Sequence, residues 1–422
     1  MMPLKTFNAG VNLVAPKKTK PMNYRHLHVK LYLLLFIVLL FGSCQKDEIL
    51  YNEEIEVILD ETIDEVSKND LDTKPADLDA HLNWIYEMQG TSGLLESAEN
   101  TDFVSLYDNA LAAILFIQQG NPERAEKIFD FYHTKKETEL ITNGGFYQSR
   151  NSSGEEGERI WMGDNAWLLI ALNHYEATYQ SNKYESLSNA LDNWLRSMQN
   201  EDGSIKGGVN SDGSIIPKVT EGILMAFNAV KGYDDFHKGI LNFLHKNRWD
   251  NTLGVLTSWP ENPQYKYAMD LHPLGNGVFQ DMPDDVLFQA NRYLNSQNVT
   301  VTGEEITGYC FDDDKDVIWL EGTAQMAVAF ASIGRFDKSE TLIVTLEKTL
   351  LNSTTVVNAQ GIPYASNHGT SYGNSMLWNH ADIAPALSST IWYSFAKLGF
   401  NPLHLGRKYD IPDGDMFWIA NN

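Results

Sequence analysis

Apolar residues in this chain recur with two different helical patterns, which alternate along the sequence. Residues 107–114 and 163–170 each carry Asp-Asn-Ala near the head of an almost continuous apolar run, and residues 220–226 and 320–327 carry Glu-Gly at the same place. A run that is apolar all round predicts a helix buried on every side. Residues 187–198 and 342–350 instead repeat Leu on one face only, which predicts half-buried helices.

The buried runs are spaced as a repeat. Asp108, Asp164 and Glu221 follow one another at intervals of 56 and 57 residues, and Glu321 comes 100 residues after Glu221, which leaves room for one more unit. A final apolar run over residues 388–398 closes the series. About six pairs of a buried and a half-buried helix predict an all-α toroid, in which inner helices form a ring and outer helices wrap it.

Two local features modify this picture. Asp-Gly pairs at residues 202–203 and 212–213 stand in near-identical polar segments, and they predict short β-hairpin turns between the units. Four prolines break any long helix between residues 259 and 284. We therefore expect the inner element of the fourth unit to lie somewhere within residues 265–278.

The alternating pattern resembles the six-hairpin glycosidase superfamily, whose members are (α/α)6 toroids, over residues 76–402. The resemblance rests on architecture and repeat spacing, and no individual family within the superfamily is identified. Asp108 and Asp164 are similar, in position and in the Asp-Asn of the second site, to the two catalytic Asp residues of unsaturated glucuronyl hydrolases. The other residues of those enzymes are not matched clearly, so their uronate substrate does not carry over.

The first part of the chain has the pattern of a secretory signal. Basic residues precede any acidic one, an apolar run covers residues 31–41, and Gly42 and Ser43 come directly before Cys44. This arrangement resembles a lipobox, and residues 45–48 resemble the acidic tract of surface-exported lipoproteins in Bacteroidetes-type bacteria. We therefore expect a signal peptide at 1–43, an acidic tether at 44–75 and the toroid at 76–422. A lipid on Cys44 would anchor it in the outer membrane, exposed at the cell surface or facing the periplasm, and an uncleaved anchor helix is the alternative.

Charge and cysteine content narrow the possible partners. The chain has 32 Lys and Arg against 56 Asp and Glu, which gives a net charge of −24. Phosphate binding needs a basic face, so this balance argues against nucleic acid as a partner. The sequence contains Cys310 as its only other cysteine. A mature monomer, which is the state we expect, therefore has no internal disulfide and depends on its core for stability.

Four carboxylic acids are the first candidates for catalysis. Asp108, Asp164, Glu221 and Glu321 all fall near the start of an inner helix, and the first turns of parallel inner helices meet at one end of the ring. Helix dipoles favour negative charge there, whereas mutual repulsion predicts a raised pKa for at least one acid. A carboxylate facing a protonated acid is what glycoside hydrolysis requires. The first prediction is that Asp164 is catalytic and that Asp108 is its partner. Glu221 and Glu321 are the alternative acid or base. For each of the four residues, helix capping is the alternative to a catalytic role.

Aromatic side chains surround these acids and predict a sugar-binding cleft, because the C–H faces of sugars stack on aromatic rings. The aromatic candidates are Tyr107, Tyr147, Trp161, Trp167, Trp319, Tyr372 and Trp378. Arg159 is a candidate partner for a substrate carboxylate. His272, His368 and His380 lie in long connections, and His380 is a candidate sugar-binding donor or general base. Core packing is the alternative for the aromatic residues, and a structural role is the alternative for the histidines.

Metal and cofactor motifs are weak in this sequence. Asp312, Asp314 and Asp316 alternate as in a calcium loop, but Val317 stands where the loop needs Gly, and no Glu occupies its twelfth position. The sequence contains no zinc-ligand spacing, no phosphate-binding Gly-rich loop and no Gly-x-Ser-x-Gly elbow. We therefore expect neither a metal nor another cofactor.

The leading hypothesis is a surface lipoprotein glycoside hydrolase that cleaves an oligo- or polysaccharide with paired carboxylates as general acid and as base or nucleophile. The same toroid hosts other chemistry. A polysaccharide lyase would use Tyr372 with His380 or His272, and a sugar epimerase would need two facing histidines. A non-catalytic glycan-binding lipoprotein would keep the aromatic residues without needing the acids. A terpene-type cyclase is disfavoured because the cluster at Asp312 lacks the Asp-x-Asp-Asp order.

Overall fold

The computed structural model describes residues 79–155, 157–372, 375–377 and 381–419. The expected signal peptide, the lipidated Cys44 and the acidic tether lie outside these residues and stay predictions. None of the helices within the described ranges has the length and the hydrophobicity needed to cross a bilayer.

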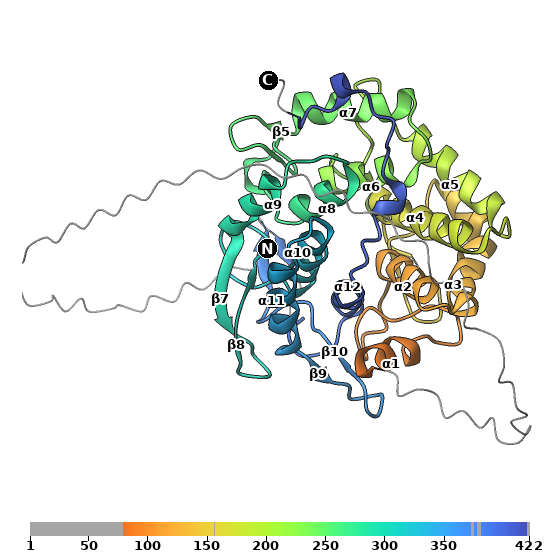
Figure 1. Cartoon of the computed structure of the whole chain (residues 1–422). Coiled ribbons are helices and arrows are strands. Elements are labelled where there is room, and N and C mark those ends of the chain that lie inside the picture. The colour runs from red at the N-terminus through yellow and green to blue at the C-terminus, as the bar shows by residue number, and fades with distance from the viewer. Residues whose placement is uncertain (1–78, 156, 373–374, 378–380, 420–422) are drawn as a thin grey trace, which may run out of the picture. The chain divides into compact units, whose positions relative to one another are not determined.

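Six helices of the described chain form a closed inner ring (Figure 1). Each packs against the next one in sequence, and the last packs against the first, so the ring has no open edge. The inner helices are α2 (Leu106–Gln118), α4 (Met162–Tyr179), α6 (Thr220–Ala229), α8 (Leu271–Val278), α10 (Leu320–Ser332) and α12 (Leu387–Leu398). Apart from α8, they correspond to the buried apolar runs, which confirms that part of the prediction.

A second set of helices wraps the ring, one against each inner helix. The outer helices are α3 (Pro122–Lys135), α5 (Glu185–Ser197), α7 (Asp235–Asn247), α9 (Asp285–Gln289), α11 (Phe336–Glu347) and α1 (Ala80–Glu87). Helix α1, from the start of the described chain, packs on α12, so the sixth pair joins the two ends of the domain. The six pairs confirm the all-α (α/α)6 toroid, and α8 lies within the range expected for the fourth inner element.

Short antiparallel strand pairs connect the units, as the turn residues indicated. The pairs are β1 (Val104–Ser105) with β2 (Ser149–Arg150), β3 (Ile160–Trp161) with β4 (Gly208–Val209), β5 (Trp249–Asp250) with β6 (Val255–Leu256), β7 (Leu294–Asn298) with β8 (Glu305–Tyr309), β9 (Leu351–Asn352) with β10 (Gln360–Gly361), and β11 (Thr370–Tyr372) with β12 (Ser375–Leu377). Helical segments of other types are the π-helix η1 (Lys136–Asn143) and the short 3-10 helices η2 (Pro263–Tyr265), η3 (Ala290–Tyr293), η4 (His404–Gly406) and η5 (Asp413–Asp415). Gly203 and Gly213 both adopt left-handed backbone angles in the two similar Asp-Gly turns.

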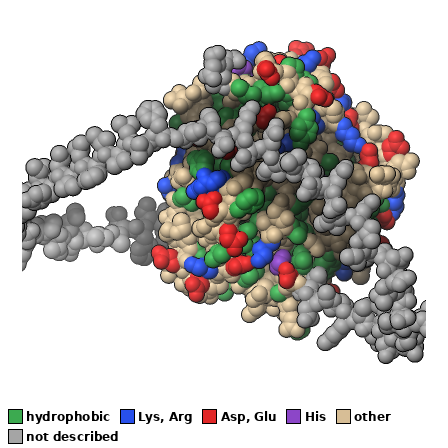
Figure 2. Space-filling view, viewed as in Figure 1, with side chains coloured by type: hydrophobic (Ala, Val, Ile, Leu, Met, Phe, Trp, Pro, Cys, Tyr) green, Lys and Arg blue, Asp and Glu red, His purple; other side chains and the backbone are tan. Residues whose placement is uncertain are grey.

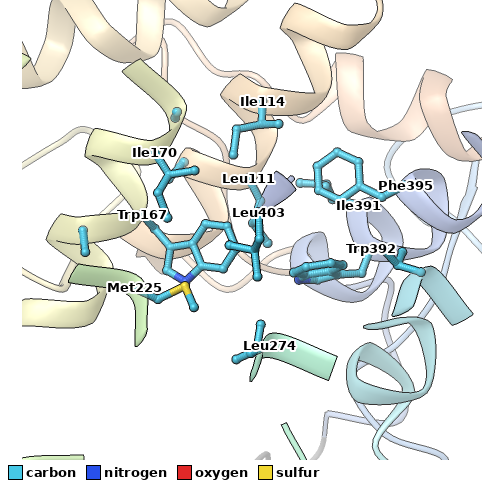
Figure 3. Close-up of a cluster of buried hydrophobic side chains, with 14 of the residues drawn as sticks. Leu111, Ile114, Trp167, Ile170, Met225, Leu274, Ile391, Trp392, Phe395 and Leu403 are labelled. Atoms are coloured by element: carbon cyan, nitrogen blue, oxygen red, sulfur yellow. The ribbon is translucent and has the colours of Figure 1, made fainter. Parts of the chain in front are cut away.

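Apolar side chains fill the inside of the ring, so the toroid has a packed centre and not a pore. Figure 3 shows Leu111 of α2, Trp167 of α4, Leu274 of α8 and Trp392 of α12 pointing toward one another, and each of these side chains is buried. Leu403, from the segment after α12, inserts between them. This core supports the polar groups that lie at the N-terminal ends of the inner helices.

The repeated Asn of Asp-Asn-Ala fixes the start of its helix. Asn109 accepts a hydrogen bond from the Leu95 N–H (2.9 Å) and donates to the Leu95 carbonyl (3.0 Å). Asn165 makes the same two bonds to Phe146, at 2.9 and 3.0 Å. A buried amide that satisfies both backbone groups of a distant residue ties the preceding segment to the helix. The neighbouring Asp is thereby held at a defined place in the first turn.

Candidate active site

Five buried or half-buried carboxylic acids stand at the same end of the inner ring. Asp108 and Asp164 occupy the third position of α2 and α4, and Glu221 and Glu321 occupy the second position of α6 and α10. Asp270 is the N-cap residue of α8 and completes the set. We call these five residues the carboxyl ring. The four acids chosen from the sequence are therefore brought to one place.

Asp270 is a functional candidate that the sequence reasoning missed. The four prolines hid the fourth unit, and no acid was selected within residues 265–278. A signal was present nonetheless, because Asp270 lies 49 residues after Glu221 and 51 residues before Glu321 and so divides the long interval almost in half. It is 9% exposed, and its Oδ1 atom has no hydrogen-bond partner among the described residues.

Burial is the main cause of a raised pKa at every member of the carboxyl ring, because the charged form loses its hydration. The raised pKa values are about 6 for Asp108, about 7 for Asp164, Asp270 and Glu321, and about 8 for Glu221. Neighbouring negative charges add to this effect. Asp108 raises the pKa of Asp164, and Asp270 and Asp164 raise that of Glu221. Ionisation of one acid therefore makes ionisation of its neighbours less favourable.

Asp164 presents an unused oxygen. Its Oδ2 atom is buried and has no hydrogen-bond partner within the part of the chain that the structure describes. A hydrogen bond from Gln148 lowers its pKa, and the charge of Arg159 does the same, but neither offsets burial and the charge of Asp108. A buried carboxylate oxygen without a donor is costly, and such a group is often found where a substrate supplies the missing partner.

Glu221 is the member of the carboxyl ring that retains partial exposure. Hydrogen bonds from Trp161 and Trp167 orient its carboxyl group and lower its pKa, although burial still dominates. Gly163 makes this approach possible, because a Cβ atom at that position would lie 3.1 Å from Glu221 Oε2 and 2.7 Å from Trp161 Nε1. The absence of a side chain at residue 163 therefore lets the carboxyl group of α6 reach across to the start of α4.

Glu321 is held by three donors. Tyr107 Oη donates to its Oε1 at 2.7 Å, Gln325 Nε2 donates to the same oxygen at 3.1 Å, and Ser388 Oγ donates to Oε2 at 2.6 Å. Trp392 Nε1 in turn donates to Tyr107 Oη at 2.8 Å. This chain links α2, α10 and α12 and fixes the orientation of the glutamate.

Asp108 has a comparable phenolic partner. Tyr364 Oη donates to Asp108 Oδ2 at 3.0 Å, and a hydrogen bond from Ser97 also lowers the aspartate's pKa. Burial and the nearby carboxylates raise the pKa values of Tyr107 and Tyr364 well above the usual range. Both phenols therefore keep their protons and act as donors.

Three of the tryptophans predicted from the sequence lie beside the carboxyl ring, one beneath the acids and two at the starts of inner helices. Trp167 is 1% exposed and lies edge-on to Tyr107, with ring centroids 5.4 Å apart, so it forms a floor under the acids. Trp161 and Trp319 are the residues that cap α4 and α10. The Arg159 guanidinium lies 4.8 Å from the centroid of the Trp161 ring and covers one of its faces.

Arg159 itself is unusual in two respects. It adopts a φ of 39°, in the left-handed region that residues other than Gly rarely enter. Its Nε atom is buried and has no hydrogen-bond partner among the described residues. Since Asp164 acts on its charge, Arg159 lies at the edge of the carboxyl ring with an unused donor.

Other candidates lie elsewhere or are not described. Tyr147 Oη accepts a hydrogen bond from the exposed Asn143 at 3.0 Å, so its hydroxyl is engaged with η1 and not with the acids. Tyr372 ends β11, but its side chain is not described, and Trp378 and His380 fall outside the described residues.

The loop histidines and the aspartate run that the sequence singled out lie outside the carboxyl ring. His272 is buried, its Nδ1 atom lies 2.7 Å from the Val286 carbonyl, and burial lowers its pKa to about 4, so it is neutral and faces α9. His368 is exposed. In the run that resembled a calcium loop, Asp314 Oδ1 accepts a hydrogen bond from the Asp316 N–H at 3.0 Å. Across the described ranges no three His, Cys, Asp or Glu side chains are grouped as metal ligands.

Some residues of the site carried little signal in the sequence. Tyr364 and Gln148 lie in connecting segments, and nothing in their local pattern indicates that they contact Asp108 and Asp164. Ser388 could have been found, because it takes the second position of α12, as Glu321 does in α10.

Solved structures share this fold at low sequence identity. An alpha-amylase from Clostridium perfringens aligns over 76% of this chain and 97% of its own, with 12% identity and a TM-score of 0.55. A sugar epimerase from a ruminal bacterium aligns over 76% and 96%, with 8% identity and a TM-score of 0.52. A wild-type glycosidase aligns over 76% and 95%, with 11% identity and a TM-score of 0.51. No protein-family model and no curated protein matches the sequence. These likenesses establish the toroid fold, and activity has to be argued from the site.

Proposed function

We propose that this protein is a glycoside hydrolase whose catalytic groups are Asp164 and Glu221. The observation that carries the proposal is the carboxyl ring, in which a largely buried acid with a raised pKa, Glu221, lies within electrostatic reach of Asp164, whose carboxyl group has an unused oxygen. Solved glycosidases with the same fold support it. The substrate we propose is an oligo- or polysaccharide, because indole rings border the acids.

The two acids divide the roles by their order of titration. Burial raises the pKa of Asp164 to about 7 and that of Glu221 to about 8, and the charges of Asp270 and Asp164 add to the shift at Glu221. Asp164 therefore ionises first, and Glu221 keeps its proton at neutral pH. Glu221 then protonates the glycosidic oxygen as the bond to the anomeric carbon breaks. Asp164, as the carboxylate, either activates water or attacks the anomeric carbon. Asp108 and Glu321 accept hydrogen bonds from Tyr364 and Tyr107. They therefore stay in fixed positions beside the two catalytic groups.

Hydrolysis fits the described residues better than proton abstraction by histidine. A sugar epimerase needs two facing histidines, and His272, at the start of α8, is bonded to the Val286 carbonyl and directed away from the acids. A lyase through His272 meets the same objection. These reactions are therefore outcomes of the test and not competing proposals.

The test is an assay of the full-length protein on a broad panel of neutral and uronate-containing glycans. Both new reducing ends and the ultraviolet absorbance of unsaturated products are followed. We expect reducing ends without absorbance, and we expect Asp164→Asn and Glu221→Gln each to lower kcat by about 10²- to 10⁴-fold. Glu201→Gln, at an exposed turn position, is the matched control and should leave the rate unchanged.

The alternatives give different results in the same assay. Unsaturated products would contradict hydrolysis and indicate a lyase. Wild-type rates in both Asp164→Asn and Glu221→Gln would mean that neither residue is catalytic. Glycan binding without any turnover in the wild-type protein would favour a non-catalytic binding protein.

The proposal also includes attachment to the outer membrane through a lipid on Cys44, with the toroid exposed to the glycan. Cys44→Ser is expected to abolish incorporation of labelled fatty acid and to release the protein from the membrane fraction. Retention of the variant in the membrane would instead indicate an uncleaved anchor helix.

A further inference from the structure

A cavity of about 730 Å³ lies at the end of the toroid opposite the carboxyl ring. It lies between the C-terminal half of α4, the C-terminal end of α6 and residues 405–410 of the C-terminal segment. Since the acids occupy the first turns of the same helices, the cavity is separated from them by the apolar core shown in Figure 3. We call it the rear cavity.

The wall formed by the C-terminal segment is firmly attached to the ring. Lys408 is 7% exposed, and its Nζ donates to the carbonyl oxygens of Asn228 (3.1 Å) and Val230 (2.6 Å) at the end of α6. Arg407 donates to the carbonyls of Asn276 (2.7 Å) and Gly277 (2.9 Å) near the end of α8. Cations at helix C-termini satisfy carbonyls that the helix itself leaves open. These two charges are therefore used to build the wall and are not free to bind an anion.

The groups that remain on the lining are mainly acceptors and apolar surfaces. Asn173 Oδ1 is buried without a hydrogen-bond partner among the described residues, while its amide nitrogen is used by the Ala229 carbonyl at 2.8 Å. Glu176 is paired with Lys231 at 2.7 Å, so its charge is compensated. Ile170 supplies a buried apolar base. An acceptor that lacks a donor favours a ligand with hydroxyl or amino hydrogens.

An exposed aromatic residue completes the lining. Tyr409 lines the cavity and is 67% exposed, so its ring is accessible to a ligand. A flat ring at the edge of a polar cavity offers a stacking face to the C–H side of a sugar. Glu176, Glu185 and Asp410 on the lining are balanced in number by Lys231, Arg407 and Lys408, so the cavity has no net charge that would select an ion.

We propose that the rear cavity binds a neutral oligosaccharide and is a second carbohydrate site, remote from the carboxyl ring. Its volume is within the range of cavities that hold small ligands. Rotation of the Asn173 side chain presents its unpaired amide oxygen to a sugar hydroxyl, Tyr409 stacks on one sugar face, and the compensated charges leave no preference for an anion. The site goes beyond the proposed hydrolase activity, because it would hold the glycan without touching a catalytic acid.

The experiment measures binding of the full-length protein to an array that contains neutral, uronate-bearing and amino-sugar glycans. It uses the Asp164→Asn background, so that turnover does not remove the ligand. Calorimetric titration with a neutral glycan from the array then counts the binding events per chain, and we expect two, one at the carboxyl ring and one in the rear cavity. Tyr409→Ala is expected to weaken one of the two events about five- to tenfold. Ala177→Arg places a long donor-bearing side chain into the cavity from an exposed helical position and is expected to abolish the same event. Phe336→Ala removes an aromatic side chain of similar exposure elsewhere and serves as the control.

Each outcome decides the proposal. Two binding events for a neutral glycan, of which one is weakened in Tyr409→Ala, lost in Ala177→Arg and kept in Phe336→Ala, support it. A single event, binding only to amino sugars or uronates, or two events that are unchanged in both cavity variants overturn it. Failure of the hydrolase proposal has a different signature, because it appears as absent turnover in the wild-type protein whether or not the rear cavity binds.

Discussion

Replacing Asp164 by Asn should stabilise the folded protein, and the gain should grow with pH. The change keeps the size of the side chain and removes only its ability to ionise. Burial raises the pKa of Asp164 from 3.8 to about 7, so between these values the native state keeps a proton that the unfolded chain has lost. The free energy of unfolding therefore decreases as the pH rises through this window, and the full loss persists above it.

The magnitude follows from the size of the shift. One pKa unit corresponds to about 1.4 kcal/mol. At pH 8 the difference between 3.8 and about 7 costs the native state roughly 4 kcal/mol, and at pH 5 the cost is somewhat under 2 kcal/mol. Asp164 is only 7% exposed, so solvent screening reduces these values little. Asp164 also interacts electrostatically with Asp108 and Glu221, so the energy calculated for Asp164 alone belongs in part to these two acids. We therefore expect the stability gain to increase by about 2 kcal/mol from pH 5 to pH 8.

The assay is thermal unfolding of wild type and variant at both pH values, with activity measured in parallel. For a chain of this length the expected gain is a rise in Tm of a few degrees that is larger at pH 8. Asp281→Asn is the control, because Asp281 is exposed and has a left-handed φ of 55° that Asn also tolerates. A variant that is less stable than wild type at both pH values, or a gain that does not change with pH, would refute the electrostatic reasoning.

Three further predictions concern the supports of the site. Asn165→Ala should lower the free energy of unfolding by about 2–4 kcal/mol, because it leaves both backbone groups of Phe146 buried without their partner; chemical denaturation measures this loss. Tyr107→Phe removes the 2.7 Å hydrogen bond to Glu321 and should lower kcat more than it changes KM, as steady-state kinetics would show. The rate of glycan hydrolysis should fall as the pH rises through about 8, where Glu221 loses its proton. A rate that stays constant up to pH 10 would exclude Glu221 as the proton donor.

The sequence predicted what depends on local pattern. The alternation of helix pairs was visible because a buried helix and a half-buried helix leave different apolar spacings, whereas the fourth pair was not recognised as one. The pairs Asp108-Asn109 and Asp164-Asn165 were visible because each Asn makes the same contact with the chain before its helix. The Asn of the repeated Asp-Asn is thus needed to attach the preceding segment to the helix, and the Asp supplies a carboxyl group to the candidate site.

Contacts between distant segments left no such trace. Tyr364 reaches Asp108 across 256 residues of sequence, and only the closed ring brings them together. Asp270 was missed because α8 is only eight residues long and begins where prolines disrupt the helical period. The acid was identifiable by counting residues between units, but not by its own surroundings in the sequence. Long-range partners and an irregular unit are thus the limits of single-sequence reasoning here.

Two opposing effects act on the carboxyl ring, and their magnitudes decide its chemistry. The N-terminal end of a helix stabilises a negative charge by about 0.3–1 kcal/mol, and by about 2 kcal/mol at most. Burial and repulsion raise the pKa of Glu221 from 4.5 to about 8, which corresponds to roughly 5 kcal/mol in the opposite direction. Helix dipoles therefore do not make these acids strong. The toroid instead collects acids that retain protons near neutral pH, and a glycan that displaces the remaining water would raise their pKa values further.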